Sequence, residues 1–197
     1  ALAVLNPKRE APGHPMADAC GAAVAFKLAW ALTGVVADAD LAALGTVADI
    51  VPLRGENRAL VALGLKQVTE RPRFGLLKLA QAANVNLKSL KASDIAFQLG
   101  PRINAGGRVG NGLVGLELML MSGERDSAAV EATDMAAELE AANTERREIE
   151  DQILEEALAM LDKKFRPEQR SIVLAGDQWH PGVIGIVASR LQRYYYR

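Results

Sequence analysis

The chain has 197 residues, of which half are hydrophobic and 24% are charged. This length and composition exclude a disordered tail, a collagen-like fibre and a polar linker, and they predict a globular protein of one ordinary domain or two small ones. The longest apolar stretch, 19–37, is interrupted by Lys27, so we expect no membrane-spanning helix. A single cysteine, Cys20, and the lack of a visible signal peptide favour a reducing cytoplasm.

The net charge of −1 conceals a segregation along the chain. Residues 131–165 hold eleven acids and four bases, a net charge of −7, which leaves +6 on the remainder. A near-neutral average ordinarily argues against a nucleic-acid partner. A basic body beside an acidic stalk is nevertheless compatible with a polyanionic substrate.

The first 122 residues alternate between apolar segments and turn signals, which predicts a body rich in helices. In chain order we expect a short buried strand at 2–5, a helix after Asp18 that is buried nearly all round and ends at Gly34, a short helix through Leu44 capped by Asp38 or Asp40, an apolar segment at 45–52, helices at 57–68 and 75–83, a helix ending at Leu99, a glycine-rich basic loop at 100–108 and a helix at 113–121.

Beyond Gly123 the composition changes to Ala, Glu and Arg, without glycine or proline until Pro167. Apolar residues spaced by three, four or seven predict one long helix over 124–164, about 60 Å in length at 1.5 Å per residue. A break at Asn143–Thr144, which can cap a second helix, is the alternative. A buried strand at 171–175 and a helix at 181–194 are expected to follow.

Asp49 is the most informative acid, because it stands among apolar residues. A buried carboxylate is costly unless a cation or several donors meet it, which makes Asp49 a candidate metal ligand. The simpler interpretation is an aspartate that caps a helix or turn beside Pro52. The segment alone modestly favours this simpler interpretation.

The segment 100–108 combines two arginines, an amide and three glycines. Glycines let backbone N–H groups approach an anion, while Arg102 and Arg108 can bind phosphate oxygens through two donors each. The alternative is a surface turn whose arginines pair with nearby acids. Composition favours neither.

The segment 176–190 predicts a turn followed by a helix with Pro181 at its first position. Gly182 and Gly185 have no side chains to cover the start of that helix, so its backbone N–H groups can bind an anion. His180 is placed to touch a bound phosphate or base, although a helix cap is its simpler role. Core packing is the simpler role of Trp179.

Three motifs in this order resemble the RecJ family, the bacterial single-strand-specific DNA exonucleases of the DHH phosphoesterase superfamily. They are Gly-Thr-Val-Ala-Asp at 45–49, Gly-Pro-Arg-Ile-Asn-Ala-Gly-Gly-Arg at 100–108 and Trp-His-Pro-Gly-Val-Ile-Gly-Ile-Val-Ala-Ser-Arg at 179–190. An acidic helix with Asn-Thr-Glu-Arg-Arg-Glu-Ile-Glu at 143–150 joins the second motif to the third. The resemblance covers nearly the whole chain.

The resemblance implies an α/β fold in three parts: the C-terminal part of a DHH domain (1–122), a connecting helix (123–166) and the first strand-helix unit of the DHH-associated domain (167–197). It implies a nuclease that removes nucleotides from the 5′ end of single-stranded DNA in recombination and repair with two Mn²⁺ or Mg²⁺ ions. Single-strand-binding protein and helicases are candidate partners of such an enzyme.

The resemblance also assigns roles to single residues. Asp49 would bind a metal ion and take part in catalysis. Phosphate or DNA contacts would come from two motifs, namely from Arg102, Asn104 and Arg108 in the second and from His180, Gly182, Ser189 and Arg190 in the third.

The chain departs from the family pattern at both ends. The upstream aspartates and the Asp-His-His triplet that supply most metal ligands are absent, and so are the remainder of the associated domain and the oligonucleotide-binding fold. His14, in a proline-rich loop, does not replace the triplet, and Gly107 stands where the family more often has alanine.

We therefore expect an internal segment of such an exonuclease, inactive by itself, because one carboxylate cannot hold two metal ions. One alternative is a RecJ-like scaffold protein that binds DNA without catalysis. The other is a phosphatase or oligoribonuclease of the same superfamily.

Overall fold

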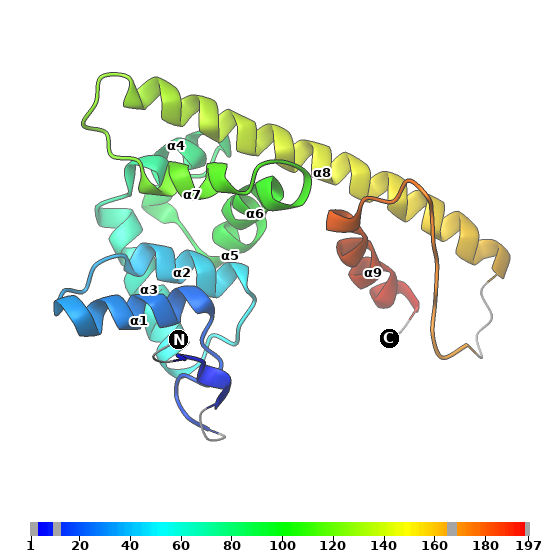
Figure 1. Cartoon of the computed structure of the whole chain (residues 1–197), viewed down its shortest axis with the longest axis horizontal. Coiled ribbons are helices and arrows are strands. Elements are labelled where there is room, and N and C mark those ends of the chain that lie inside the picture. Colours follow the sequence, from blue (N-terminus) through cyan, green and yellow to red (C-terminus); the bar gives the residue numbers. More distant parts are fainter. Residues whose placement is uncertain (1–3, 10–12, 165–168, 196–197) are drawn as a thin grey trace.

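The computed structural model describes residues 4–9, 13–164 and 169–195 (Figure 1). Throughout this part of the chain the regular structure is helical, and no residue is assigned to a strand. The α-helices are α1 (Gly21–Thr33), α2 (Ala39–Ala48), α3 (Gly55–Glu70), α4 (Phe74–Ala82), α5 (Ala92–Asp94), α6 (Gly100–Val109), α7 (Leu113–Leu120), α8 (Ala128–Lys164) and α9 (Pro181–Tyr195). Short 3₁₀ helices at Pro7–Arg9 and Leu87–Ser89 and a π-helical turn at Ile95–Leu99 complete them.

The long helix α8 organises the molecule. It has 37 residues, so it is about 55 Å long at 1.5 Å per residue. Figure 1 shows α4, α6 and α7 beside its first half, α1 to α3 further away from it in the same body, and α9 beside its second half. The predicted long helix is confirmed, and the alternative of a break at Asn143–Thr144 is wrong, because helix assignment continues through both residues.

The body beside the first half of α8 has an apolar core made by α2, α3, α4, α7 and α8. Leu76, Leu79, Leu99, Leu118 and Leu139 are all at most 1% exposed within it. Burying one such side chain contributes about 1.5–3 kcal/mol of transfer free energy. A smaller cluster, centred on Ala23, Phe26 and Ala39, joins α1 to α2 and α3.

An ion-pair cluster ties α4 to α2. The Arg73 side chain, just before α4, donates from Nε to Asp40 Oδ2 over 2.9 Å and from Nη2 to Asp38 Oδ1 over 2.5 Å. Asp40 is 2% exposed, and burial of a carboxylate is costly unless a cation pairs with it. The hydrogen bond that Arg73 donates to Asp40 raises the pKa of Arg73.

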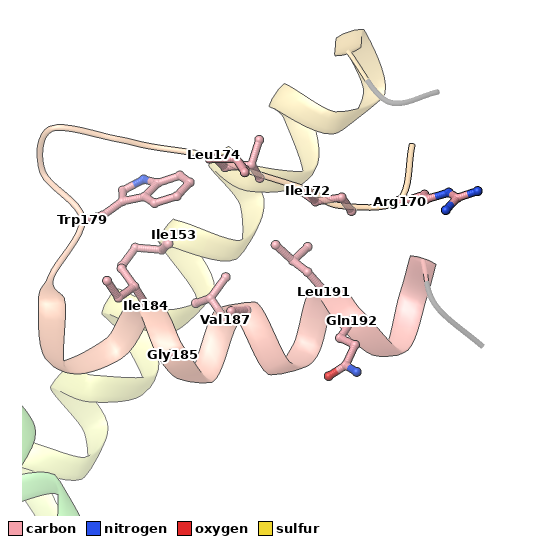
Figure 2. Close-up of a pocket in the computed structure, with 12 residues that line it drawn as sticks. Ile153, Arg170, Ile172, Leu174, Trp179, Ile184, Gly185, Val187, Leu191 and Gln192 are labelled. Carbon is pink, nitrogen blue, oxygen red and sulfur yellow. The ribbon is translucent and has the colours of Figure 1, made fainter. Parts of the chain in front are cut away.

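A separate apolar cluster fastens α9 to the second half of α8. Ile153, Ala157 and Leu161 of α8 meet Val183 and Val187 of α9. Figure 2 shows Ile153 facing α9, with the extended segment 170–174 passing across α8 and running alongside α9. An apolar hollow of about 680 Å³ lies between that segment and α9.

The segment 100–108 differs from its prediction: it is the helix α6 and not a loop. Helix α6 continues directly from the π-helical turn at Ile95–Leu99. Pro101 lies in its first turn, a position where proline, which has no backbone N–H, is tolerated. Arg102, Ala105 and Gly106 are buried, which is the periodicity of a helix packed on one side.

Three further expectations are wrong near the N-terminus. Val4 and Leu5 are each 61% exposed and not in a strand, whereas 1–3 lie outside the described residues. Helix α1 is also not buried all round, because Trp30 and Leu32 on it are exposed. Cys20 caps α1, with Sγ accepting from the Ala23 N–H over 3.4 Å, in place of the expected Asp18.

The segment 171–175 is extended, and Ile172 and Leu174 turn towards the cluster between α8 and α9 while Val173 is 89% exposed. This alternation is typical of a strand, yet no partner strand occurs among the residues that the structure describes. The helix-rich part of the fold prediction is confirmed, and its strand-helix unit stays a prediction.

Candidate functional site

Asp49 follows the last turn of α2 as its C-terminal cap. Its N–H donates to the carbonyl oxygen of Gly45 over 3.0 Å, and its side chain is exposed. The expectation of a buried carboxylate is wrong, because α2 extends to Ala48 and carries the chain to the surface just before Asp49. The simpler interpretation, a helix-end aspartate, describes its place in the fold.

Asn104 on α6 lies beside Asp49. Both residues line a shallow hollow of about 330 Å³, together with Cys20, Gly21 and Gly45. Asn104 also lines the neighbouring apolar hollow between α2, α6 and α7. The structure therefore brings the first two sequence motifs together, at the end of α2 and on one face of α6.

Helix α6 divides the residues of the second motif between two faces. Asn104 and Arg108 are four residues apart, so they are neighbours on one face of the helix, and both are exposed. Arg102 is two residues from Asn104, which turns its side chain towards the opposite face. An open face with Asn104 and Arg108 thus stands opposite a buried face with Arg102.

Arg102 is 9% exposed and faces α8. Its Nε and Nη2 donate to the two carboxylate oxygens of Glu140, and its Nη1 donates to the Gln98 carbonyl oxygen over 2.7 Å. A guanidinium held through three nitrogens by its own protein has little left for a phosphate. This geometry favours the interpretation that the arginine pairs with a nearby acid.

The start of α9 touches the end of α6. Arg108 Nη1 donates to the Gly182 carbonyl oxygen over 3.0 Å, and His180 Nδ1 accepts from the Gly182 N–H over 3.1 Å. His180 therefore caps α9, as its simpler interpretation predicts. Trp179 packs against the cluster between α8 and α9, which likewise matches its simpler role.

Ser189 and Arg190 lie further along α9. The exposed Ser189 hydroxyl donates to the Gly185 carbonyl oxygen over 3.0 Å. Arg190 Nη1 donates to Glu150 Oε1 over 3.0 Å and to Asp151 Oδ1 over 2.9 Å. The hydrogen bond that Arg190 donates to Asp151, and next to it the one that it donates to Glu150, raise the pKa of Arg190.

Four of the eight sequence-predicted residues thus form one strip, and two others face away from it. Asp49, Asn104, Arg108 and Gly182 follow one another from α2 across α6 to α9, with each neighbour sharing a hollow, a helix face or a hydrogen bond. Arg102 and Arg190 instead face α8, each against a carboxylate of that helix.

Sequence reasoning missed the polar residues on the buried face of α8. Asn143, Arg146 and Glu150 continue the three- and four-residue spacing between the apolar residues Leu139 and Ile153. Polar residues that interrupt an apolar stripe at its own spacing are the signal that could have identified them.

Among the described residues, no group of three or more His, Cys, Asp or Glu side chains is arranged to hold a metal ion. Asp49 is the acid on the strip formed by Asp49, Asn104, Arg108 and Gly182. None of the helices in the described ranges has the length and hydropathy needed to cross a bilayer.

No family model matches the chain. Individual proteins do: the chain is 38% identical over 197 residues to the single-stranded-DNA-specific exonuclease RecJ of Bacillus subtilis, covering 99% of this chain and 24% of that protein. It is 43% identical over 177 residues to RecJ of Thermus thermophilus, covering 87% and 25%, and 36% identical over 218 residues to RecJ of Escherichia coli, covering 100% and 37%.

Solved structures give the same result. The crystal structure of T. thermophilus RecJ in complex with Mn²⁺ matches with a TM-score of 0.75 at 39% identity, over 88% of this chain and 26% of that one. A structure of the exonuclease RecJ bound to manganese matches with a TM-score of 0.72 at 39% identity, over 88% and 44%. The chain spans about a quarter to just over a third of the length of these curated relatives.

Proposed function

Since the chain belongs to the RecJ family of single-stranded-DNA-specific exonucleases, we propose that the protein hydrolyses phosphodiester bonds of single-stranded DNA from the 5′ end, in recombination and repair. The observation that carries the proposal is the strip of Asp49, Asn104, Arg108 and Gly182. It joins the three sequence motifs across α2, α6 and α9.

In this proposal the open face of α6 and the start of α9 hold the DNA strand. Arg108 uses one guanidinium donor on Gly182, and a guanidinium has five, so the others are available for a phosphate. Asn104 adds an amide one helical turn away. Further contacts to the DNA strand along α9 are assigned to the exposed hydroxyl of Ser189 and to the exposed edge of Arg190.

The relatives whose structures match contain Mn²⁺ or Mg²⁺. The described residues do not fit a two-ion site by themselves, because no group of three or more His, Cys, Asp or Glu side chains among them is arranged to hold a metal ion. We propose that Asp49 supplies one ligand of such a site. The roles of Asn104 and Arg108 concern the DNA strand alone.

A DNA-binding scaffold protein of this family without nuclease activity stays the alternative candidate function. Action in the cytoplasm, contacts with single-strand-binding protein or a helicase, and a sheet that begins at 171–175 stay predictions. The extended, alternately buried segment 171–175 is what supports the sheet.

The first prediction concerns catalysis by the 197-residue chain alone. We expect no release of nucleotides from 5′-labelled single-stranded DNA with Mn²⁺, because a single carboxylate does not hold the ions. Mn²⁺-dependent release that disappears in Asp49→Ala would contradict this expectation. In an exonuclease of the relatives' length that contains this segment, the same substitution should abolish release. Persistence of activity there would remove Asp49 from the ligand set.

The second prediction concerns Arg108→Ala. We expect weaker binding of single-stranded DNA, and a slope of log K against log salt that is smaller by about 0.7, because one phosphate contact is lost. Fluorescence anisotropy of a labelled oligonucleotide at four salt concentrations, without divalent ions, measures both quantities. Arg147→Ala, an exposed arginine on α8, is the matched control and should change neither. Equal slopes in the two variants would count against a phosphate contact by Arg108.

A further inference from the structure

The middle of α8 carries a buried polar network between its two apolar contact regions. On one side Leu139 belongs to the core of the body, and on the other Ile153 belongs to the cluster with α9. Between them Arg146 donates from Nη1 to Glu150 Oε2 over 2.5 Å and from Nη2 to Asn143 Oδ1 over 3.2 Å. The network lies on α8 between the part that packs against the body and the part that packs against α9.

Glu150 connects this network to α9. Its second carboxylate oxygen, Oε1, accepts from Arg190 Nη1 over 3.0 Å. One carboxylate thus bridges an arginine of its own helix and an arginine of α9. Its side chain is 10% exposed, and a carboxylate so far removed from water is retained only where its oxygens are paired.

The two arginines do not depend equally on Glu150. Arg190 is 37% exposed and also bonds Asp151, so it keeps a carboxylate partner when Glu150 is changed. Arg146 is 11% exposed and has Glu150 as its carboxylate partner, while its Nε is already buried without an acceptor among the described residues. Removal of the Glu150 charge therefore leaves a buried guanidinium uncompensated.

The apolar contacts between α8 and α9 hold the helices together without fixing how they slide or rotate, because apolar burial has no direction. Charge-assisted hydrogen bonds add that direction. Arg190 fixes α9 on α8 through Glu150, and Gly182 fixes the start of α9 on Arg108 of α6. These two points, and the hydrogen bond that Trp179 Nε1 donates to Glu156 Oε2 over 2.7 Å, together set where the start of α9 stands against α6.

We propose that Glu150 is a positioning residue that sets α9 against α6 and so aligns the two halves of the DNA-holding strip. The inference rests on the proposed function, since it concerns the strip formed by Asp49, Asn104, Arg108 and Gly182. Glu150 does not touch the strand. It acts through Arg190 and α9.

The test begins with Glu150→Gln, which keeps the shape of the side chain and removes its charge. Hydrogen–deuterium exchange of the 197-residue chain should show amides of α9 exchanging about tenfold faster, with α1 to α4 unchanged. Binding of a labelled single-stranded oligonucleotide should weaken about fivefold. Glu148→Gln, on the exposed side of α8, is the matched control and should leave both measurements unchanged.

A double-mutant cycle with Arg190→Gln separates positioning from a general loss of stability. If Glu150 acts through Arg190, then Glu150→Gln should weaken DNA binding by less than twofold once Arg190 is already glutamine. Full additivity would overturn the proposal, and so would unchanged exchange in α9. Arg190→Gln alone removes the same contact at its more exposed partner. It therefore replaces Glu150→Gln in the exchange and binding measurements if Glu150→Gln does not fold.

The outcomes also distinguish this inference from the proposed function. Faster exchange in α9 of Glu150→Gln, but without DNA binding by the unmodified chain, would support the docking role of Glu150 and contradict the proposed strand-holding strip. If Arg108→Ala weakens DNA binding and Glu150→Gln does not, the strand-holding strip is supported and the positioning role of Glu150 is contradicted.

Discussion

Replacing Gly75 with alanine is expected to destabilise the body by about 4 kcal/mol or more, the largest effect of any single methyl group in this chain. Gly75 lies in the first turn of α4, where the helix presses against the end of α7. An alanine Cβ at this position would lie 1.7 Å from the carbonyl oxygen of Leu118 and 2.6 Å from its carbonyl carbon. Both atoms are backbone, so no side-chain rotation can relieve the overlap and one of the two helices must move.

Urea unfolding followed by circular dichroism measures this loss. Gly107→Ala is the matched control, because it adds the same methyl group to a helix at a position with no atom within 4 Å. Helix propensity alone should make that variant more stable by about 0.5–1 kcal/mol. Similar unfolding midpoints for Gly75→Ala and the unmodified chain would show that α4 and α7 are not packed as closely as described.

Elements with regular periodicity were predictable from the sequence. The run without glycine or proline after Gly123 and its apolar spacing predicted α8, and Gly34 and Pro72 marked the ends of α1 and α3 correctly. These signals are local: a left-handed residue or an absent N–H ends a helix wherever it occurs.

Helix α6 was not predictable in the same way, because its composition opposes its structure. Three glycines and a proline among ten residues favour a loop by propensity, yet packing of Arg102, Ala105 and Gly106 on neighbouring helices outweighs that preference. The exposure of Asp49 was missed for a related reason. Its apolar neighbours suggested burial, and only the length of α2 reveals that the residue follows a helix end.

The site was predictable as a set of motifs but not as a geometry. The motif residues Asn104 and Arg108 share a face only because the segment is helical, and Arg102 points away for the same reason. The acids of α8 illustrate the limit further. The net charge of −7 over 131–165 is visible in the sequence, but only the structure shows that Glu140 and Glu150 face inward against Arg102 and Arg190.

The second large effect is expected for Gly182→Ala, at the contact between α9 and α6. An alanine Cβ there would lie 2.4 Å from the carbonyl oxygen of Arg108 and 3.1 Å from its carbonyl carbon. Alanine is the better helix former by about 1 kcal/mol, so α9 itself should not weaken. The cost falls on the docking of α9 against α6, and we expect binding of single-stranded DNA to weaken about thirtyfold, equivalent to about 2 kcal/mol.

Gly185→Ala separates these two consequences of adding a methyl group to α9. Its Cβ meets no atom within 4 Å, so this variant gains the helix propensity without disturbing the contact with α6. Anisotropy titrations of both variants with the same oligonucleotide should therefore diverge, with Gly185→Ala binding as the unmodified chain does. If both bind equally well, the approach of α9 to Arg108 is not what holds the strand, and DNA recognition must be sought on the face of α6 alone. If both weaken equally, exposed positions along α9 contact the DNA directly, and the strand extends past Gly182 towards Ser189.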